Sequence, residues 1–380
     1  MRKIILGVCI LAITVLAGVR SLPAQDAVSE LKKLDEQRMK SINDGDIAAV
    51  GALLADDYVH VHNTGEVNNK AQYLAFLQAH PRKSSRENRR EAMLKNPNLA
   101  SPDPRRAAHV PKDQAEFLAI YESRLKEIVS FLNANRLVTI PDYVGAFQIR
   151  ELPAAFKPTS PGGFMNPPGI YDKDPVGFYF IPTYDPNSGN FYIRAAIEDP
   201  RPILAHEGIP GHFLQLSIAN HLQDEIRLQH ADTVFTEGWA LYGEEMLSRE
   251  GLYPDNSVAQ AQVLRLSRYR AARIGVDVNL HTGRWNFEQA VGYFMEAGGL
   301  DREAAEGEAA GAASSPTQKI SYITGKWQIM RLLGRYRDRQ GPEFRLGAFH
   351  DQLISYGSLP VSVIEFLMLD DETSLRTALQ

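Results

Sequence analysis

A short segment near the middle of the chain combines residue types that bind metal ions. It reads His206-Glu207-Gly208-Ile209-Pro210-Gly211-His212. Zinc prefers imidazole nitrogen and carboxylate oxygen as ligands, and a catalytic zinc keeps one coordination position for water. In the common His-Glu-x-x-His arrangement, the glutamate beside the first histidine acts as a base on that water. The segment therefore predicts a hydrolytic zinc site in which His206 and His212 bind the metal and Glu207 is the base.

The spacing of the two histidines departs from that common arrangement. They are six residues apart, and six residues of regular helix turn the second imidazole about 240° away from the first. Gly208, Pro210 and Gly211 stand between them, and these residue types break or tighten a helix. We therefore expect a looped turn here that returns His212 toward His206.

A second cluster of acidic residues begins 25 residues after His212, in the segment Thr236-Glu237-Gly238-Trp239-Ala240-Leu241-Tyr242-Gly243-Glu244-Glu245. Peptidases of the gluzincin kind take their third zinc ligand from a glutamate on the following helix, at about this distance. Glu237 is therefore the expected third ligand. Glu244 lies two turns further along roughly the same helix face, where it could support a ligand from behind. Tyr242 is a further candidate for contact with a ligand or the substrate, although tyrosine at such a position more often belongs to the core.

Five motifs in residues 111–380 carry a resemblance to a known family. They are His206-Glu207-x-x-Pro210-Gly211-His212-x-x-Gln215, Glu237-Gly238-Trp239-Ala240-Leu241-Tyr242, Asp277-Val278-x-x-His281, Gln318-x-x-Ser321-Tyr322-x-x-Gly325-Lys326 and Phe349-His350-Asp351. This region resembles the C-terminal half of the bacterial family called domain of unknown function 885. The resemblance implies a helical, gluzincin-like zinc peptidase of the thimet-oligopeptidase type.

The resemblance also implies a role for a tyrosine. Related helical peptidases use a tyrosine to stabilise the oxyanion that forms from the scissile carbonyl, and Tyr322 matches that position. The alternative for Tyr322 is a buried side chain that packs between helices. His281 is a candidate for a contact with the substrate or behind the ligands. Its neighbours Arg273 and Asp277 could equally form a plain salt bridge one helical turn apart.

Composition excludes several classes of protein. The chain has 380 residues, of which 44% are hydrophobic and 23% charged, as in globular proteins. A net charge of -5 gives no indication of nucleic acid as a partner. Cys9 is the only cysteine, so neither a disulfide nor a thiolate metal cluster can form within the chain.

The N-terminus predicts export. Arg2 and Lys3 precede an apolar run over residues 4–19, and Ala24 follows shortly after. This pattern is typical of a secretory signal peptide, here residues 1–24 with cleavage near Ala24. A single membrane anchor is the alternative, but the run is shorter than the ~20 residues that span a bilayer. We expect a secreted or periplasmic protein that leaves the membrane after cleavage.

Residues 26–80 predict a short α+β segment, in the order helix, helix, strand, turn, helix. Tyr58-Val59-His60-Val61-His62 alternates as a strand does, and Asn63-Thr64-Gly65 supplies a turn. The segment weakly resembles the start of a nuclear-transport-factor-2-like domain of the ketosteroid-isomerase type. His60 and His62 would share one strand face, as a metal pair, as pocket residues or as exposed side chains. Residues 81–110 are rich in proline and basic residues and predict a linker.

Residues 111–380 predict a mainly α-helical domain with a small β-hairpin. Helices are expected at about 202–229, 232–249, 256–281, 287–298, 317–338 and 342–356. The hairpin is expected between residues 177–181 and 191–193, around a Pro-Asn-Ser-Gly-Asn loop. Its second strand could pair with an extended peptide. Residues 302–315, rich in Ala, Glu and Gly, predict a loop or a poorly specified helix end.

These observations favour zinc-dependent hydrolysis of peptide bonds in exported or periplasmic peptides, with endopeptidase and exopeptidase action both open. One alternative is an exported binding protein that keeps the peptidase fold with a degenerate site. Another is a small-molecule binder that acts through residues 26–80. The sequence gives no indication of the oligomeric state.

Overall fold

The computed structural model of the chain describes residues 24–61, 67–79, 110–156, 162–173, 175–254 and 256–378. Two compact units are present, residues 1–107 together with 333–338, and residues 108–332 together with 339–380. The predicted signal peptide lies outside the described residues except for Ala24, and the predicted linker lies outside them except for Val110. Of the helices in the described part of the chain, none is both long enough and apolar enough to cross a membrane.

The N-terminal unit has the predicted order of elements. They are α1 (Ala24–Asp44), α2 (Ile47–Leu53), β1 (Val59–Val61), β2 (Val67–Asn69) and α3 (Lys70–Ala79). Asp46 begins α2 by accepting a hydrogen bond from the Ala49 N–H. The strands pair antiparallel, and a small core forms around Val50 and Tyr73. The predicted turn at residues 63–65 and His62 lie outside the described residues, so the His60–His62 pair stays a prediction.

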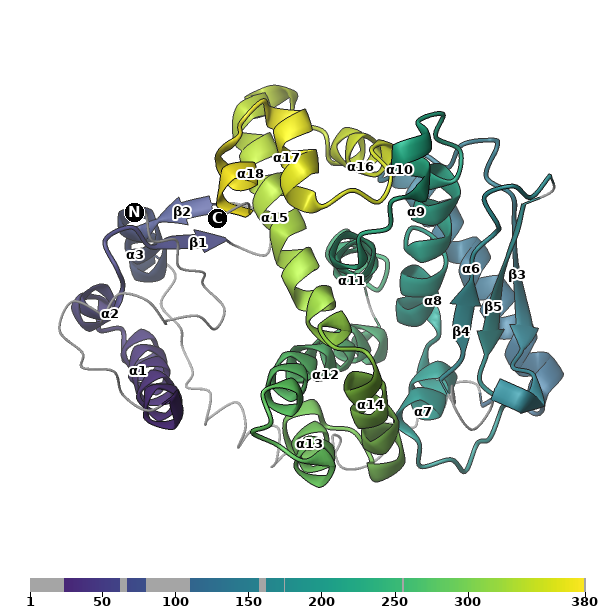
Figure 1. Ribbon diagram of the computed structural model, residues 1–380, viewed down its shortest axis with the longest axis horizontal. Coiled ribbons are helices and arrows are strands. Elements are labelled where there is room, and N and C mark those ends of the chain that lie inside the picture. The colour runs from purple at the N-terminus through teal and green to yellow at the C-terminus, as the bar shows by residue number, and fades with distance from the viewer. Residues whose placement is uncertain are drawn as a thin grey trace. The chain divides into compact units, whose positions relative to one another are not determined.

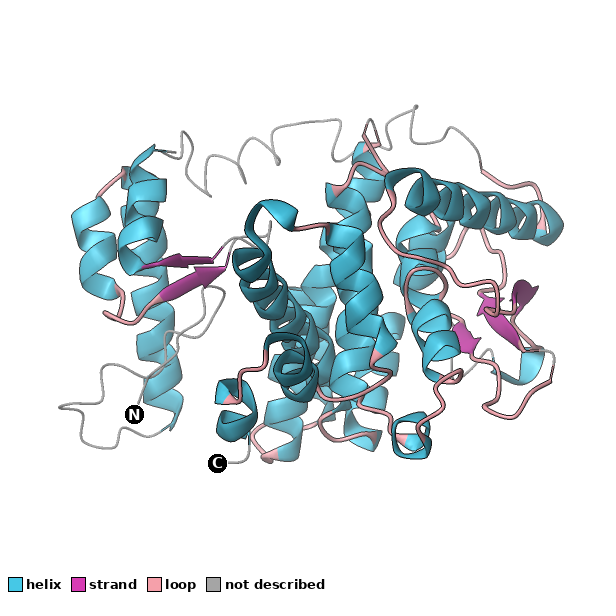
Figure 2. Ribbon diagram, turned by 90° about the horizontal axis from the view of Figure 1, so that it is seen from above, coloured by secondary structure: helices cyan, strands magenta, loops and turns pink. Residues whose placement is uncertain are grey.

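The larger unit is mainly helical, which confirms the predicted fold class (Figures 1 and 2). Its first elements are α6 (Gln114–Asn135), β3 (Ala146–Glu151), β4 (Phe164–Asn166), β5 (Val176–Ile181), α7 (Phe191–Glu198), α8 (Arg201–Glu207), α9 (His212–Ala219), α10 (Glu225–Gln229) and α11 (Thr233–Arg249), with a 3-10 turn at Ala154–Phe156. The remaining elements are α12 (Ser257–His281), α13 (Phe287–Tyr293), α14 (Arg302–Ser314), α15 (Ser321–Gln340), α16 (Leu346–Ser355), α17 (Val361–Leu369) and α18 (Thr373–Ala378). A π-helical turn covers Phe294–Gly298, and 3-10 turns cover Gln318–Ile320 and Gly341–Glu343.

A three-stranded sheet packs against the helices that carry the histidine motif. The strand order is β3-β5-β4, with β3 parallel and β4 antiparallel to β5. Alternate residues of β5 are buried, as expected for a strand with one face in the core. Phe147 of β3 stacks on Phe213 of α9, with ring centroids 4.5 Å apart. The sheet therefore supports α9 directly behind its first turn.

The prediction that residues 191–193 form the second strand of a hairpin was wrong. Residues 191–193 form the first turn of α7, and the antiparallel neighbour of β5 is β4, which precedes it in the chain. Asn190 caps this helix by accepting a hydrogen bond from the Tyr192 N–H, and Asp301 accepts one from the Phe191 N–H. These contacts outweigh the strand preference of Phe and Tyr. No edge strand for a peptide therefore exists at residues 191–193.

The prediction of a loop or a poorly specified helix end at residues 302–315 was also wrong, because residues 302–314 form the regular helix α14. Asp301 caps it by accepting a hydrogen bond from the Ala304 N–H. Ala305, Ala309 and Ala312 are buried in a core shared with α12 and α13. Small alanine side chains let this helix pack closely, and alanine is the residue with the highest helix propensity.

The helices α11 and α16 are joined by a buried histidine. His350 donates from Nδ1 to the Leu137 carbonyl at 2.6 Å, and its Nε2 accepts from the Tyr242 hydroxyl at 2.8 Å. His350 is fully buried, and burial lowers the pKa of its imidazole to about 4.

This lowered pKa predicts a loss of stability in acid. The unfolded chain takes up a proton at His350 near pH 6.5, whereas the folded chain does so only near pH 4. The free energy of unfolding should therefore fall by about 3 kcal/mol from this residue as the pH drops through that window. Urea unfolding at pH 7 and pH 4.5 measures the fall, and His350→Gln is the control that should reduce it. An equal fall in both proteins would contradict the assignment.

Candidate metal centre

The two histidines of the motif meet across a break between two helices. Helix α8 ends at Glu207 and α9 begins at His212. A Cβ atom at Gly211 would lie 1.9 Å from the His206 carbonyl oxygen, so only glycine lets the chain pass this close to the end of α8. The imidazole centroids of His206 and His212 are 4.6 Å apart, with their planes nearly perpendicular. The expected looped turn is therefore present, and it brings the two rings together.

Glu237, near the start of α11, completes a group of three ligand atoms. Its Oε2 lies 3.6 Å from His206 Nε2 and 3.3 Å from His212 Nε2. One atom from each residue falls within 4.8 Å of the other two. Burial opposes ionisation of Glu237, but the two histidines outweigh it and hold the pKa of its carboxyl well below its usual range.

The chemistry of this group fits a zinc ion. Glu237 Oε2 is buried and has no hydrogen-bond donor among the described residues. A buried carboxylate oxygen without a donor is rare unless a cation or water serves it. Two imidazole nitrogens and one carboxylate oxygen are the ligand set of many catalytic zinc sites, with a fourth position left for water. His206, His212 and Glu237 are therefore the residues that would hold the metal.

Behind the first histidine lies a buried ion pair. Glu244 Oε1 is 2.7 Å from His206 Nδ1, and Arg270 of α12 lies 2.9 Å from the same oxygen. Glu244 and Arg270 are almost fully buried. A carboxylate against Nδ1 favours the proton on that nitrogen and leaves Nε2 free for a metal. The structure thus places Glu244 where the sequence predicted support for a ligand.

Tyr322, the predicted oxyanion donor, lies beside the same group. Its ring is nearly parallel to that of His206, with centroids 6.0 Å apart. Gln318 Nε2 donates hydrogen bonds to Glu237 Oε1 at 3.1 Å and to the Tyr322 hydroxyl oxygen at 3.2 Å. Burial raises the pKa of Tyr322 well above its usual value, so its hydroxyl keeps its proton and can donate. Sequence reasoning missed this role of Gln318, whose only signal was its place in the Tyr322 motif.

A single aspartate fixes the turn that carries Gln318. Asp277 of α12 accepts hydrogen bonds from the backbone N–H groups of Thr317 and Lys319, both at 3.0 Å. Thr317 has a φ of 70°, in the left-handed region that non-glycine residues seldom occupy. The salt bridge considered between Arg273 and Asp277 is not made. Arg273 instead pairs with Glu308.

Helices α11 and α15 approach each other closely enough for their backbones to touch. A Cβ atom at Gly238 would lie 2.3 Å from the carbonyl carbon of Gly325. A Cβ atom at Gly325 would in turn lie 1.7 Å from the Val234 carbonyl oxygen. This contact fixes the distance between the helix that carries Glu237 and the helix that carries Tyr322.

The remaining predicted residues lie around or outside this group. Glu207, the last residue of α8, is half-buried and is not one of the three converging ligands. Tyr242 turns toward α16, where its hydroxyl contacts His350. His281 Nε2 lies 2.9 Å from the Ala312 carbonyl oxygen, which ties α12 to α14. The structure therefore does not bring Tyr242 or His281 to the metal ligands.

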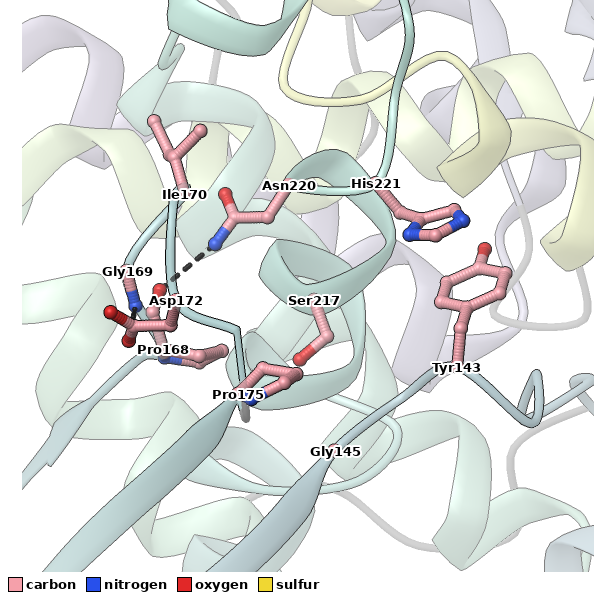
Figure 3. Close-up of a pocket in the computed structure, with 10 residues that line it drawn as sticks. All are labelled: Tyr143, Gly145, Pro168, Gly169, Ile170, Asp172, Pro175, Ser217, Asn220 and His221. Atoms are coloured by element: carbon pink, nitrogen blue, oxygen red, sulfur yellow. Dashed lines mark hydrogen bonds between the residues drawn. The ribbon is translucent and has the colours of Figure 1, made fainter.

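A separate cavity of about 110 Å³ lies at the far end of α9 (Figure 3). Tyr143 and His221 stack at its edge with centroids 3.8 Å apart, and Ser217 and Asn220 come from the end of the helix. None of the three metal-ligand residues lines it. This cavity is therefore distinct from the candidate metal centre.

Comparison with known proteins gives one family and two similar structures. Residues 31–368 match the family described as bacterial protein of unknown function, DUF885. A candidate lipoprotein of unknown function from Shewanella oneidensis is 27% identical, with a TM-score of 0.57 over 68% of this chain and 46% of that one. A candidate lipoprotein from Colwellia psychrerythraea is 23% identical, with a TM-score of 0.59 over 88% of this chain and 51% of that one. No protein with a curated description matches the sequence.

The chain spans about half the length of these two solved structures. The family match begins at residue 31, well before residue 111, where the region that carries the five motifs begins. It thus includes the segment that weakly resembles a nuclear-transport-factor-2-like domain, a likeness that stays a prediction. Because the match covers most of its residues, this chain belongs to the bacterial DUF885 family.

Proposed function

We propose that this protein is a zinc-dependent hydrolase of peptide bonds. The observation that carries the proposal is the convergence of His206, His212 and Glu237 on a buried carboxylate oxygen that makes no hydrogen bond within the described part of the chain. The break between α8 and α9 supports it, because it brings both imidazoles to the same carboxylate.

The chain's own residues would share the work of the reaction. When bound, zinc supplies a water of lowered pKa and a Lewis acid for the carbonyl oxygen. Glu207 would take a proton from the attacking water and pass it to the leaving amine. Tyr322 would donate a hydrogen bond to the carbonyl oxygen as negative charge develops there. Gln318 would hold Glu237 and Tyr322 in fixed relation.

We further propose that the protein acts outside the cytoplasm. The apolar N-terminal run predicts export. The structural relative from Shewanella oneidensis is described as a candidate lipoprotein, a class of exported protein. Peptides of the periplasm or the surroundings of the cell would then be the substrates.

Zinc content tests this proposal directly. The purified chain without residues 1–24 should hold about one zinc ion, and His206→Ala and His212→Ala should each lose it. Chelation should lower the melting temperature, because a ligand present at a hundred times its Kd stabilises the folded state by about 2.7 kcal/mol. His221→Ala, at the separate cavity, is the matched control and should keep the metal. A chain that takes up no zinc even after reconstitution would rule out the hydrolase and favour a binding protein with a degenerate site.

A further inference from the structure

Two cationic side chains near Tyr322, the buried Arg273 and the largely buried Lys319, lack a full set of hydrogen-bond acceptors. Arg273 donates from Nε and one terminal nitrogen to Glu308, at 2.8 and 2.7 Å. Its other terminal nitrogen is buried and has no acceptor in the described residues. Lys319 Nζ has three donors to satisfy, and the ion pair that it forms in the described chain is with Glu308, at 3.4 Å.

Glu308 cannot serve both cations fully. Its two oxygens already accept two hydrogen bonds from Arg273 and one from the Tyr192 hydroxyl. The other carboxylate whose charge acts on the Lys319 ammonium is Glu237, whose Oε1 already accepts a hydrogen bond from Gln318. Burial, and then the charge of Arg273, lower the pKa of the Lys319 ammonium. An acceptor that the described residues do not supply would therefore stabilise both cations.

Lys319 is also held at the edge of the candidate metal centre. It follows Gln318, which contacts Glu237, and it precedes Tyr322 by three residues. Its side chain is 13% exposed, so it is not closed off from solvent. On α14, a Cβ atom at Gly311 would lie 3.2 Å from Lys319 Nζ. Glycine at that position leaves room for the ammonium.

We propose that Lys319, together with Arg273, binds the C-terminal carboxylate of the substrate peptide. This inference rests on the proposed function and names its substrate class, peptides with a free C-terminus that are cut close to that end. A carboxylate offers two oxygens, so it can accept from both cations. Lys319 lies in the 3-10 turn that leads into α15, three residues before Tyr322, which is roughly 5–6 Å along the chain axis at about 1.5–2.0 Å per residue. One extended residue spans roughly 3.5 Å. A carbonyl at Tyr322 and a carboxylate at Lys319 would then be separated by one or two residues.

Paired peptides test the proposal. The probes are one short peptide as the free acid, the same peptide with a C-terminal amide, and versions with Glu or Gln as the last residue. The wild type should cleave the free acids with the lower KM. Lys319→Met should raise the KM of the free acids about ten- to hundredfold, since hydrogen bonds to charged groups contribute that much. The KM of the amides should not change, and Lys319→Arg should keep part of the preference.

A lysine further along α15 provides the matched control. Lys326 pairs with Glu245, which also pairs with Arg249, so Lys326→Met should fold and keep the preference for free acids. If the wild type cleaves acids and amides equally well, the inference is wrong while the proposed function stands. A preference that follows Glu over Gln, regardless of the terminus, would also overturn it.

Binding without turnover separates this inference from the proposed function. In the Glu207→Gln protein, calorimetry with an N-acetylated alanine tripeptide as acid and as amide measures affinity alone. The acid should bind about ten- to hundredfold more tightly, and adding Lys319→Met should remove the difference. If neither peptide is cleaved by the wild type, the proposed function fails, but this binding difference still decides whether Lys319 recognises a carboxylate.

Discussion

Replacing Glu207 with glutamine is expected to lower the kcat of peptide hydrolysis about 10²- to 10⁴-fold, the usual contribution of a general base. Glutamine keeps the shape of the side chain but cannot accept a proton at neutral pH. Zinc content should stay at about one per chain, because Glu207 is not among the three converging ligands. Steady-state kinetics and elemental analysis of the same preparation measure both quantities.

The control for this substitution is an exposed glutamate at the end of another helix. Glu250→Gln, just after α11, should leave both kcat and zinc content unchanged. Two outcomes would contradict the assignment of Glu207. Loss of zinc would make it a ligand, and unchanged hydrolysis would mean that another group is the base.

Replacing Gly238 with alanine is expected to reduce both stability and zinc binding. In an open helix this change would gain up to about 1 kcal/mol from helix propensity. At Gly238 the new methyl group would meet the backbone of Gly325 at 2.3 Å, and backbone atoms cannot rotate away as side chains do. Overpacking of this kind costs about 1–3 kcal/mol. Urea unfolding measures the loss of stability, and elemental analysis shows whether Glu237 still reaches the metal.

Gly307 on α14 provides the opposite case. A Cβ atom there would meet nothing within 4 Å. Gly307→Ala should therefore leave zinc content unchanged and raise the free energy of unfolding by up to about 1 kcal/mol. If Gly238→Ala has the same effect as Gly307→Ala on the free energy of unfolding and on zinc content, the backbones of α11 and α15 are not in close contact.

Residue chemistry accounts for the part of the candidate site that the sequence could predict. Imidazole and carboxylate groups near each other in the sequence indicate a metal site. The glycine and proline residues of the Gly208–Gly211 segment predict a break in the helix. Those signals are local, so they led to His206 and His212 without knowledge of the fold, whereas Glu237 was expected from the ligand spacing of gluzincin peptidases. The mainly helical class followed from long apolar periodicities in the same way.

The errors arose where a long-range contact decides the local structure. Phe191, Tyr192 and Ile193 favour a strand, but Asp301, more than a hundred residues away, accepts a hydrogen bond from the first N–H of α7. Helix α14 looked poorly specified because Gly307 and Gly311 lower its helix propensity, and the sequence does not show that its alanines are buried against α12 and α13. The positions of Gln318 and Lys319 likewise depend on Asp277, which accepts hydrogen bonds from the backbone of the turn that carries them. Sequence spacing carries no signal for such pairings.

One face of helix α12 positions three parts of the candidate site. Arg270, Arg273 and Asp277 stand three and four residues apart, so they share one face of the helix. Each holds a different part of the centre, namely the ion pair behind His206, the surroundings of Tyr322 and the turn that carries Gln318. One residue inserted upstream in α12 would rotate this face by about 100° and shift it by about 1.5 Å. The candidate site would lose all three supports at once, although His206, His212 and Glu237 themselves had not changed.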